Sequence, residues 1–269
     1  MQRHIIYWVR RLTAGCVFAL TAAAASDEGL RLVQQVHDRP IARDSAFVSR
    51  MELTDRNGVR RVRELVTYRQ ERSKGEFHSL ARFLAPADIA GTGLLSVDRA
   101  DGSSEQWLYL PAMDRVRRVA SDRKGGRFVG SDLYFEDLQT RSPGSDNHRL
   151  VGREIIDGVD CAVVESVPVE SGNSVYRRRL LWIDPQLAIV MRVDFFEKDE
   201  TMPSKRWTMR AKQRVQGFLT ITDSKTLDLT SGHETRIVAQ TIKFDRKLPA
   251  KLFSTQALAD ESLEAGYRP

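Results

Sequence analysis

The segment WLYLPAMDRVRRVASDRKGGRFVGSDLYFEDL, residues 107–138, decides the fold of this 269-residue chain. Residues 107–110 are apolar on both alternating faces, which is typical of a strand that is covered on both sides. After a proline turn, the apolar and basic residues of 115–120 predict a second short strand. A charged loop over 121–130 then leads into a short helix over 131–138. The segment therefore predicts a sheet, a hinge and a small helical cover.

Two adjacent glycines, Gly125 and Gly126, form the predicted hinge of this cover. Ser131 or Asp132 is expected to supply the N-cap oxygen of the short helix. The apolar side chains that would pack the cover onto the sheet are Leu133, Tyr134 and Leu138. We therefore expect this part of the chain to act as a lid.

The first 25 residues have the layout of a secretory signal peptide, residues 1–25. Three arginines precede an apolar run, and a tract of small residues places the predicted cleavage near Ala25. A lipid anchor at Cys16 is the alternative, but the most apolar part of the segment follows this cysteine, so simple cleavage is favoured. No later segment has the roughly 20 apolar residues of a membrane-spanning helix. The sequence therefore predicts a periplasmic protein with a single domain, residues 26–269.

The charge balance argues against a nucleic-acid partner. Lysine and arginine number 42 against 36 acidic residues, and three of the arginines belong to the predicted signal. Nucleic-acid binding needs basic residues clustered on one face of a recognisable module, which this sequence does not show. Cys161 is the one cysteine outside the predicted signal, so no intrachain disulfide is expected.

A single amphipathic helix over residues 27–39 is predicted to open the mature domain, with Leu30 and Val33 on its apolar side. The apolar period then falls to two, and turn signals such as Asn57-Gly58 recur at short intervals. Candidate strands lie near residues 46–55, 59–71, 75–85, 92–99, 104–110, 115–120, 149–156, 159–168, 174–184, 187–197, 204–214, 218–230 and 234–245. Because no long helix separates them and some are expected to merge, the chain predicts one mainly β domain with a curved antiparallel sheet of about 11 strands.

A sheet of this width is expected to bend around a cavity as an unclosed half-barrel, because eight strands already suffice for a barrel filled by its own side chains. The residues predicted to line the cavity share the apolar face of their strands; they are Phe47, Met51, Phe77, Phe83, Leu94, Trp107, Tyr109, Leu180, Trp182, Phe195 and Trp207. The opposite faces carry charged pairs such as Arg50 with Glu52 and Arg177 with Arg179. An ordinary closed core, with the aromatic residues packed against the N-terminal helix, fits the pattern equally well.

Four segments resemble the bacterial outer-membrane lipoprotein-sorting protein family: GTGLLSVDR at 91–99, WLYLPAMDRVRRVAS at 107–121, GSDLYFEDL at 130–138 and LPAKLFSTQAL at 248–258. The resemblance implies the LolA-like fold, an unclosed antiparallel barrel with an apolar concave face and a helical lid. It also implies carriage of an acylated or lipidic cargo across the periplasm. The similarity is to the subgroup found beside inner-membrane exporters of the resistance-nodulation-division class, which makes such an exporter the implied partner.

The sequence shows no pattern typical of a catalytic or metal site. His37, His78, His148 and His233 are isolated, and no metal-binding, nucleophile-elbow or phosphate-loop spacing is present. Cys161 shares a strand face with valines and is interpreted as a small core residue. We therefore expect no enzymatic activity, no cofactor and no metal.

Two charged groups allow alternative interpretations. Glu136 and Asp137, with Asp132, are interpreted as the capped and solvated end of a helix rather than as a catalytic acid pair. Three arginines beside the cover could meet an anionic headgroup or an acidic partner at the cavity mouth, or could belong to a solvated face; they are Arg115, Arg117 and Arg118.

These observations predict a monomeric periplasmic carrier that binds lipid or lipoprotein acyl chains and contacts membranes only transiently. Shielding these chains from water contributes about 0.8 kcal/mol for each methylene group. Two alternatives remain: an accessory subunit of an envelope exporter that holds no cargo, and a hydrolase of acylated substrates.

Overall fold

The computed structural model describes residues 13–170, 172–198 and 201–269, with side chains from residue 24 onward. Within these residues, thirteen strands form one antiparallel sheet in the order β6-β5-β4-β3-β2-β1-β13-β12-β11-β10-β9-β8-β7. Their bounds are β1 Asp44–Thr54, β2 Arg60–Ser73, β3 Glu76–Ala85, β4 Gly93–Asp98, β5 Ser104–Leu110, β6 Arg115–Arg118, β7 Asp146–Ile156, β8 Val159–Pro168, β9 Arg178–Asp184, β10 Ile189–Phe196, β11 Lys205–Val215, β12 Phe218–Asp228 and β13 Glu234–Phe244. The predicted mainly β fold with one unclosed sheet is confirmed, and none of the candidate strands merged.

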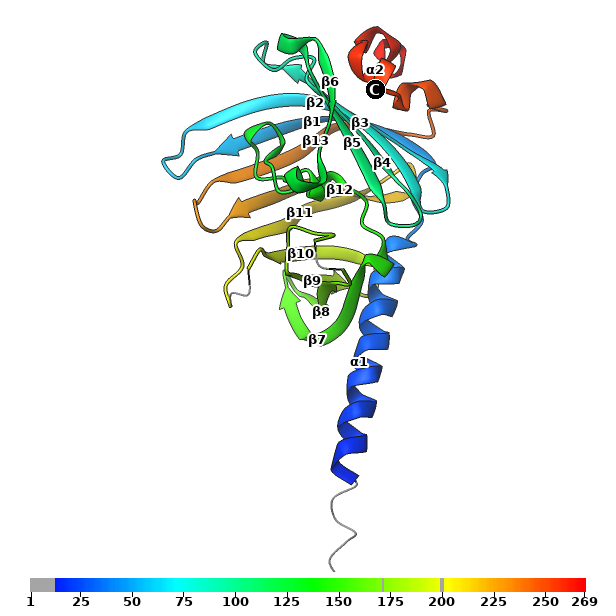
Figure 1. Ribbon diagram of the computed structural model, residues 1–269, viewed down its shortest axis with the longest axis vertical. Coiled ribbons are helices and arrows are strands. Elements are labelled where there is room, and N and C mark those ends of the chain that lie inside the picture. Colours follow the sequence, from blue (N-terminus) through cyan, green and yellow to red (C-terminus); the bar gives the residue numbers. More distant parts are fainter. Residues whose placement is uncertain (1–12, 171, 199–200) are drawn as a thin grey trace, which may run out of the picture.

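The order of the strands explains why the sheet stays open. β1 pairs with both β2 and β13, so two meanders meet at the centre of the sheet, and β6 and β7 are its two edges. Residues 119–145, which we call the crossover segment, join these edges and lie across one face of the curved sheet (Figure 1). We call the face beneath the crossover segment the inner face and the opposite one the outer face.

The helices and turns of the described residues lie outside the sheet. They are α1 Thr13–His37 and α2 Thr255–Ala259, with the 3-10 turns η1 Pro111–Met113, η2 Ser121–Arg123, η3 Phe128–Gly130, η4 Glu136–Leu138, η5 Pro143–Ser145, η6 Ala250–Phe253, η7 Glu261–Leu263 and η8 Ala265–Tyr267. Among the described residues, neither α1 nor α2 provides the long apolar stretch that a membrane-spanning helix needs. The predicted signal, residues 1–25, begins outside the described residues and stays a prediction.

Helix α1 packs on the inner face beside β7, and its N-terminal half extends away from the sheet (Figure 1). Leu32 is buried against Val164 and Ile183, whereas Leu30, which was predicted on the apolar side, is 45% exposed. The two leucines point to opposite sides because two residues correspond to about 200° of helical rotation. At Gly29 the helix approaches the strand so closely that an added Cβ would lie 2.8 Å from the backbone of Arg149.

The outer face of β1–β5 is covered by the C-terminal segment, residues 248–267. Leu252 and Leu258 are fully buried against this part of the sheet. An ion pair fixes the segment, because Arg82 Nε donates to Glu264 Oε1 at 2.9 Å and both side chains are almost completely buried. Arg82 Nη2 also donates to the carbonyl oxygen of Ala257 at 2.9 Å. The C-terminal segment therefore forms a second packed layer that the strand pattern alone does not reveal.

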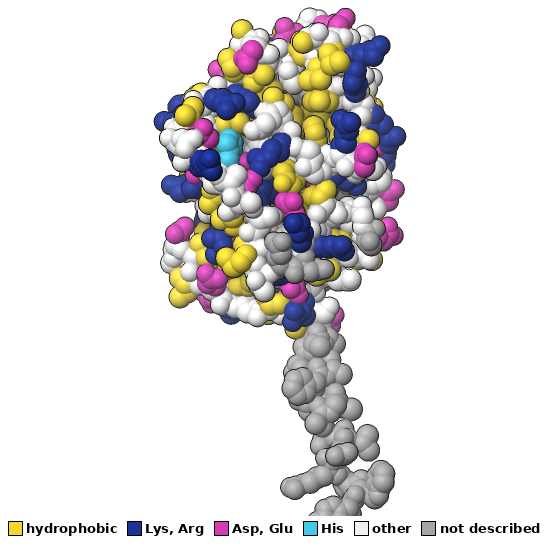
Figure 2. Space-filling model, turned by 60° about the vertical axis from the view of Figure 1, so that its left-hand side comes forward, with side chains coloured by type: hydrophobic (Ala, Val, Ile, Leu, Met, Phe, Trp, Pro, Cys, Tyr) yellow, Lys and Arg dark blue, Asp and Glu magenta, His cyan; other side chains and the backbone are white. Residues whose placement is uncertain are grey.

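Elsewhere the outer face carries ion pairs, as the alternation predicted. Arg50 lies 3.1 Å from Glu52, and Arg206 lies 2.6 Å from Asp194. On the face shown in Figure 2, basic side chains are scattered among acidic and hydrophobic ones and do not gather in one patch. The arginines of these pairs are partly exposed, whereas Glu52 and Asp194 are 7% and 3% exposed. This surface is therefore charged rather than apolar.

Candidate functional site

The crossover segment is anchored to the inner face by apolar side chains. Phe128 is 1% exposed, and its ring centroid lies 5.4 Å from that of Phe83 on β3. Leu133 packs into the same cluster. Two backbone hydrogen bonds shape the segment into a small hairpin, one from Phe128 N to Leu133 O at 2.8 Å and one from Phe135 N to Gly126 O at 3.1 Å. The predicted cover is therefore present, and it is packed onto the sheet.

The predicted helix over residues 131–138 is wrong, and the partners of Asp132 explain why. Its carboxylate accepts a hydrogen bond from Thr235 Oγ1 at 2.7 Å and lies 2.6 Å from His233 Nδ1. These contacts bind it to β13 and its preceding turn, so it does not cap a helix. The segment forms an isolated bridge between Arg127 and Tyr134 and the 3-10 turn η4 instead.

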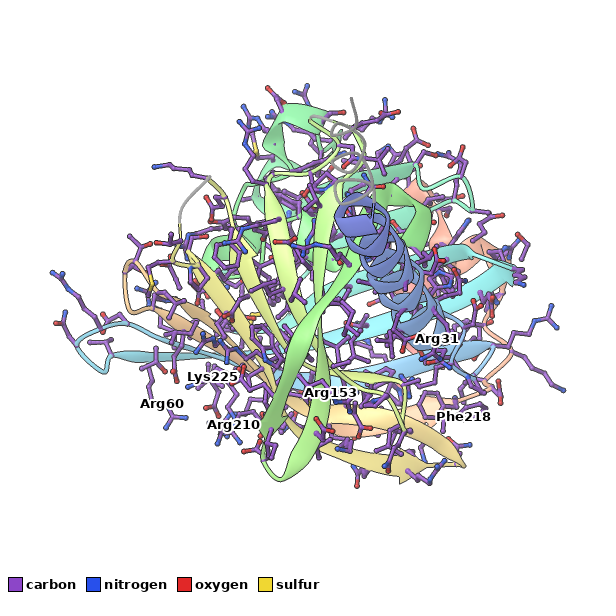
Figure 3. The ribbon with its side chains drawn as sticks, turned by 90° about the horizontal axis from the view of Figure 1, so that it is seen from below. Arg31, Arg60, Arg153, Arg210, Phe218 and Lys225 are labelled. Atoms are coloured by element: carbon purple, nitrogen blue, oxygen red, sulfur yellow. The ribbon has the colours of Figure 1, made fainter. Side chains whose placement is uncertain are left out.

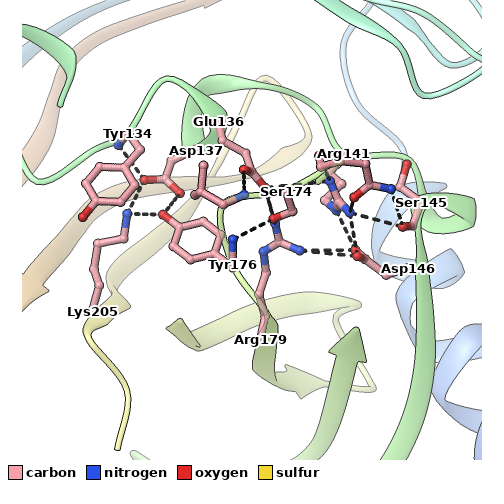
Figure 4. Close-up of polar contacts among 12 residues, drawn as sticks. Tyr134, Glu136, Asp137, Arg141, Ser145, Asp146, Ser174, Tyr176, Arg179 and Lys205 are labelled. Carbon is pink, nitrogen blue, oxygen red and sulfur yellow. Dashed lines mark hydrogen bonds and ion pairs between the residues drawn. The ribbon is translucent and has the colours of Figure 1, made fainter. Parts of the chain in front are cut away.

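A buried ion-pair network continues from η4 to strand β9 (Figure 4). Glu136, 6% exposed, accepts hydrogen bonds from Arg179 Nη2, from Ser174 Oγ and from the backbone N–H of Val175, the last at 2.7 Å. Arg179 also donates to Ser174 Oγ at 2.7 Å. The interpretation of Glu136 as part of a solvated helix end is thus wrong, because this carboxylate is enclosed by donors from β9 and the turn before it.

A second group joins the crossover segment to β11. Asp137 accepts hydrogen bonds from Lys205 Nζ and, at 2.7 Å, from Tyr176 OH. The Lys205 ammonium, on a side chain that is 2% exposed, lies 3.8 Å from the ring centroid of Tyr134, which stacks parallel to Tyr176 with 6.0 Å between the centroids. The ammonium is therefore held between a carboxylate and two aromatic rings (Figure 4).

The third group lies where the crossover segment enters β7. Arg141 makes a bidentate pair with Asp146, with both nitrogen–oxygen distances at 2.6 Å. Arg179 Nη1 reaches the same carboxylate at 3.4 Å. His148 lies two residues after Asp146 on β7. Its Nδ1 is 2.7 Å from Ser166 Oγ, and its Nε2 is 2.9 Å from Pro143 O. Asp146 and Glu136 thus form one continuous network with Arg141 and Arg179.

Burial shifts the pKa values of these groups. It lowers the pKa of Lys205 and of Arg179, because a cation loses hydration when it leaves water. Burial also lowers the pKa of His148, and raises the pKa of Tyr176 well above its usual value. Around Lys205 and Arg179, the carboxylates of Asp137, Glu136 and Asp146 act in the opposite direction and favour the charged forms.

A cavity of about 370 Å³ lies beneath this network. Its apolar wall comes from α1, the crossover segment and strands β9–β11; the side chains are Val33, Leu133, Leu181, Val190, Val193, Phe195 and Trp207. Its polar wall is the network itself, with Glu136, Asp137, Arg141, Asp146, His148, Arg179 and Lys205. We call this the first cavity. It has one apolar side and one charged side, which suits an amphipathic ligand.

A second cavity, of about 380 Å³, lies where α1 leads into β1. Phe47, Phe218 and Phe244 form one side, with ring centroids 5.9 Å apart for Phe47 and Phe244 and 5.3 Å apart for Phe218 and Phe244. Arg39 and Arg69 also line it. Both cavities fall in the range of about 300–1,000 Å³ that is typical of small-molecule sites.

The predicted cavity residues separate into several environments. Phe195 and Trp207 line the first cavity, and Phe47 and Phe77 line the second. The crossover segment covers three others, Met51, Phe83 and Leu94. The remaining four line neither cavity; they are Trp107, Tyr109, Leu180 and Trp182.

These four residues have partners elsewhere. Trp107 and Tyr109 pack in the outer-face cluster that the C-terminal segment covers. Leu180 and Trp182 lie on the other face of β9 from Arg179, in the cluster around Cys161. Trp182 Nε1 donates to Glu154 Oε2 at 2.7 Å.

The predicted lid residues also have defined surroundings. An added Cβ at Gly126 would lie 3.3 Å from the ring of Phe135, and one at Gly125 would lie 3.2 Å from Val175. Leu133 lines the first cavity, Tyr134 contacts Lys205, and Leu138 packs in the cluster beneath the crossover segment.

The edge arginines lie apart from both cavities. Arg115, Arg117 and Arg118 are exposed on β6, and Arg118 pairs with Glu105 of β5. They line neither cavity.

The sequence prediction missed Arg179 and Lys205. The alternation in β9 had placed Arg179 on the solvated face with Arg177, but it points to the inner face, where its counter-ions come from residues more than 30 positions earlier in the chain. The signal was the acidic pair Glu136 and Asp137, which need buried cations once the crossover segment lies on the sheet.

Other reactive groups are sparse in the described residues. Cys161 is a free thiol with 0% exposure, as predicted for a core residue, and burial raises its pKa. In the part of the chain that the structure describes, no cluster of three or more His, Cys, Asp or Glu side chains could hold a metal ion.

Comparison with known proteins places this geometry in a family. A family model whose description reads "Uncharacterized protein" matches residues 75–260, more than half of the chain. A DUF1329 family protein from Desulfovibrio piger has 26% sequence identity and a TM-score of 0.82, covering 87% of this chain and 99% of that one. No curated protein matches the sequence at a significant level.

Two further solved structures share the fold. One, from Vibrio parahaemolyticus, is described as an outer-membrane lipoprotein-sorting protein domain; it has 25% identity and a TM-score of 0.81, covering 87% of this chain and 99% of its own. A LolA superfamily protein from Nitrosomonas europaea, at 18% identity, has a TM-score of 0.68 and covers 85% of this chain and 98% of its own. The chain therefore belongs to the matched, DUF1329-like family and has the LolA-like fold of the outer-membrane lipoprotein-sorting proteins that it resembles.

Proposed function

We propose that this protein is a periplasmic carrier that takes up the hydrocarbon part of a lipid or lipoprotein on the inner face of its half-barrel. The observation that carries the proposal is the first cavity, whose apolar wall ends in a buried charged network. Each methylene group that moves from water into such a cavity contributes about 0.8 kcal/mol. The similarity to a lipoprotein-sorting domain from Vibrio parahaemolyticus supports the same class of cargo.

The carrier needs no covalent chemistry in this account. The polar groups of the first cavity already have partners within the protein: Glu136 is bound by Arg179, and Asp137 is bound by Lys205. Their role is to hold the crossover segment in place over the cavity. We propose that docking to a membrane partner, such as an inner-membrane exporter of the resistance-nodulation-division class, displaces this segment and releases the cargo.

A cavity-filling variant tests where the cargo binds. Val193 lines the first cavity between its sheet neighbours Leu181 and Trp207. We expect Val193→Trp to fill the cavity and to weaken binding of an uncharged fluorescent fatty-acyl ester to delipidated protein by about tenfold or more. Val62→Trp is the matched control, because Val62 is exposed on β2.

Two results would contradict the proposal. Equal probe binding by Val193→Trp and Val62→Trp would place the cargo outside the first cavity. Failure of the unmodified protein to bind any acyl probe would leave the accessory-subunit role as the better account of the fold.

A further inference from the structure

The second cavity differs from the first in its charges. Arg39, Arg43 and Arg69 line it, whereas Glu71 is the one acidic side chain among its lining residues. In the first cavity the arginines and the lysine meet carboxylates at ion-pair distance. The second cavity therefore combines a wall of phenylalanine rings with arginines that lack the close carboxylate partners of the first cavity.

Arg39 is held by backbone rather than by an acid. Its Nη1 donates to the carbonyl oxygen of Leu219 on β12 at 2.5 Å, and its Nε is buried without a hydrogen-bond partner. Burial lowers the pKa of this guanidinium. A buried donor without a partner typically costs about 1–3 kcal/mol, and an acceptor on a bound anion would offset this cost.

Arg69 is in a similar position on β2. Its Nη2 donates to the Thr140 hydroxyl at 3.3 Å, and its guanidinium carbon lies 4.2 Å from the ring centroid of Phe77. Burial lowers its pKa, while Asp98 and Glu71 act on it through space in the opposite direction. Among the described residues, neither Arg39 nor Arg69 has a carboxylate as a hydrogen-bond partner.

An anion in this cavity would supply hydrogen-bond acceptors and a negative charge to both Arg39 and Arg69. A guanidinium binds a carboxylate or phosphate through parallel N–H groups, and such hydrogen bonds are roughly twice as strong as neutral ones. The three phenylalanines beside it offer an apolar surface that an inorganic anion cannot use. Figure 3 shows Phe218 at one end of the sheet, with Arg60 and Lys225 at the other.

We infer that the second cavity binds an anionic amphiphile, with its acidic head beside Arg39 and Arg69 and its hydrocarbon tail against Phe47, Phe218 and Phe244. This inference rests on the proposed carrier function and assigns acidic lipids, such as fatty acids, to the second cavity. Neutral acyl chains would bind in the first cavity without this preference.

Calorimetry with two matched probes tests the inference. Laurate carries the acidic head, and methyl laurate has the same chain without the charge. The measurements use delipidated protein with the first cavity filled by Val193→Trp, so that the second cavity is observed alone. We expect laurate to bind about ten- to hundredfold more tightly than methyl laurate. Arg69→Gln should abolish this preference, with Arg39→Gln as a second variant in case the first does not fold.

Arg210→Gln is the matched control, because Arg210 is an exposed arginine of β11 that lines neither cavity. It should keep the preference for laurate. Equal binding of laurate and methyl laurate, or equal behaviour of Arg69→Gln and Arg210→Gln, would overturn the inference and leave the carrier function standing.

Two further outcomes distinguish a lipid headgroup from a free anion, and the second-cavity inference from the carrier function. Inorganic phosphate that binds as tightly as laurate would show a site for a free anion and would overturn the inference. If the unmodified protein binds neither laurate nor methyl laurate, the carrier function itself fails.

Discussion

At the scale of single residues, the buried cations determine how the crossover segment is held. Lys205 lies on β11 and Arg179 on β9, and both meet acids of the crossover segment. An ion pair of this kind adds little stability compared with an apolar pair of the same shape, but removing one partner leaves a buried charge. The network therefore fixes the position of the crossover segment, and removing one of its charged side chains should strongly lower the stability of the fold.

Lys205→Met tests this role. The substitution leaves the Asp137 carboxylate buried without its cation, and we expect the free energy of unfolding to fall by about 3–5 kcal/mol. Arg210→Met, on the exposed side of the same strand, should change it by less than about 0.5 kcal/mol. Urea denaturation measures both values. A loss for Lys205→Met no larger than that for the control would show that the ion pair does not hold the segment.

His148 makes stability depend on pH. The usual pKa of a histidine side chain is 6.5, and burial lowers the pKa of His148 below this value in the folded protein. As the pH falls below 6.5, the unfolded chain therefore binds a proton before the folded chain does. Stability is therefore complete above pH 6.5 and falls as the pH decreases, by at most about 1.4 kcal/mol per pH unit from this group. Denaturation at pH 7 and pH 5 should show a smaller decrease for His148→Gln than for the unmodified protein. An identical decrease would exclude His148 as the cause.

At the scale of elements, the strands were predictable and the pieces that cover them were not. The thirteen candidate strands follow from alternation and turns, which are local properties of the sequence. Trp107 and Leu108 are both apolar, so the pattern could not say which of them faces the cavity. In the folded protein the C-terminal segment covers Trp107, so Trp107 lies on the outer face. This contact joins residues that are far apart in the chain, and the local pattern could not predict it.

Helix α1 depends on its close approach to β7. Gly29→Ala places a Cβ 2.8 Å from the backbone of Arg149, so the helix must shift. We expect the free energy of unfolding to fall by about 1–3 kcal/mol, as at other overpacked sites. Gln35→Ala is the control, because this side chain of α1 is exposed. Thermal unfolding compares the two, and equal midpoints would mean that α1 is not tightly docked.

A disulfide tests whether the crossover segment must move for release. Asp132 and Thr235 are in contact, with Asp132 N donating to Thr235 Oγ1 at 2.9 Å. The double variant Asp132→Cys with Thr235→Cys should retain a bound acyl probe in the presence of acceptor vesicles when oxidised. Reduction with dithiothreitol should restore release. Equal release from the oxidised and reduced forms would remove the crossover segment from the mechanism.

At the scale of the whole molecule, the sheet is wide, open at both edges and covered by different segments on its two faces. The first cavity lies between α1, the crossover segment and the sheet, and the second lies beside the link from α1 to β1. The C-terminal segment packs tightly against part of the outer face. The sequence predicted a bent sheet with an apolar interior. It could not reveal that charged residues of the crossover segment, β7, β9 and β11 meet at the first cavity, because their contacts arise only when the crossover segment lies on the sheet.

The most direct test of a carrier is what the protein holds when it is isolated. Protein purified without detergent from the periplasm of a producing bacterium would be extracted with organic solvent, and the extract analysed by lipid mass spectrometry. We predict bound lipid with the unmodified protein and with Val62→Trp, and clearly less lipid with Val193→Trp, in which only the second cavity stays open. An extract of the unmodified protein that contains no more lipid than that of Val193→Trp would contradict the account.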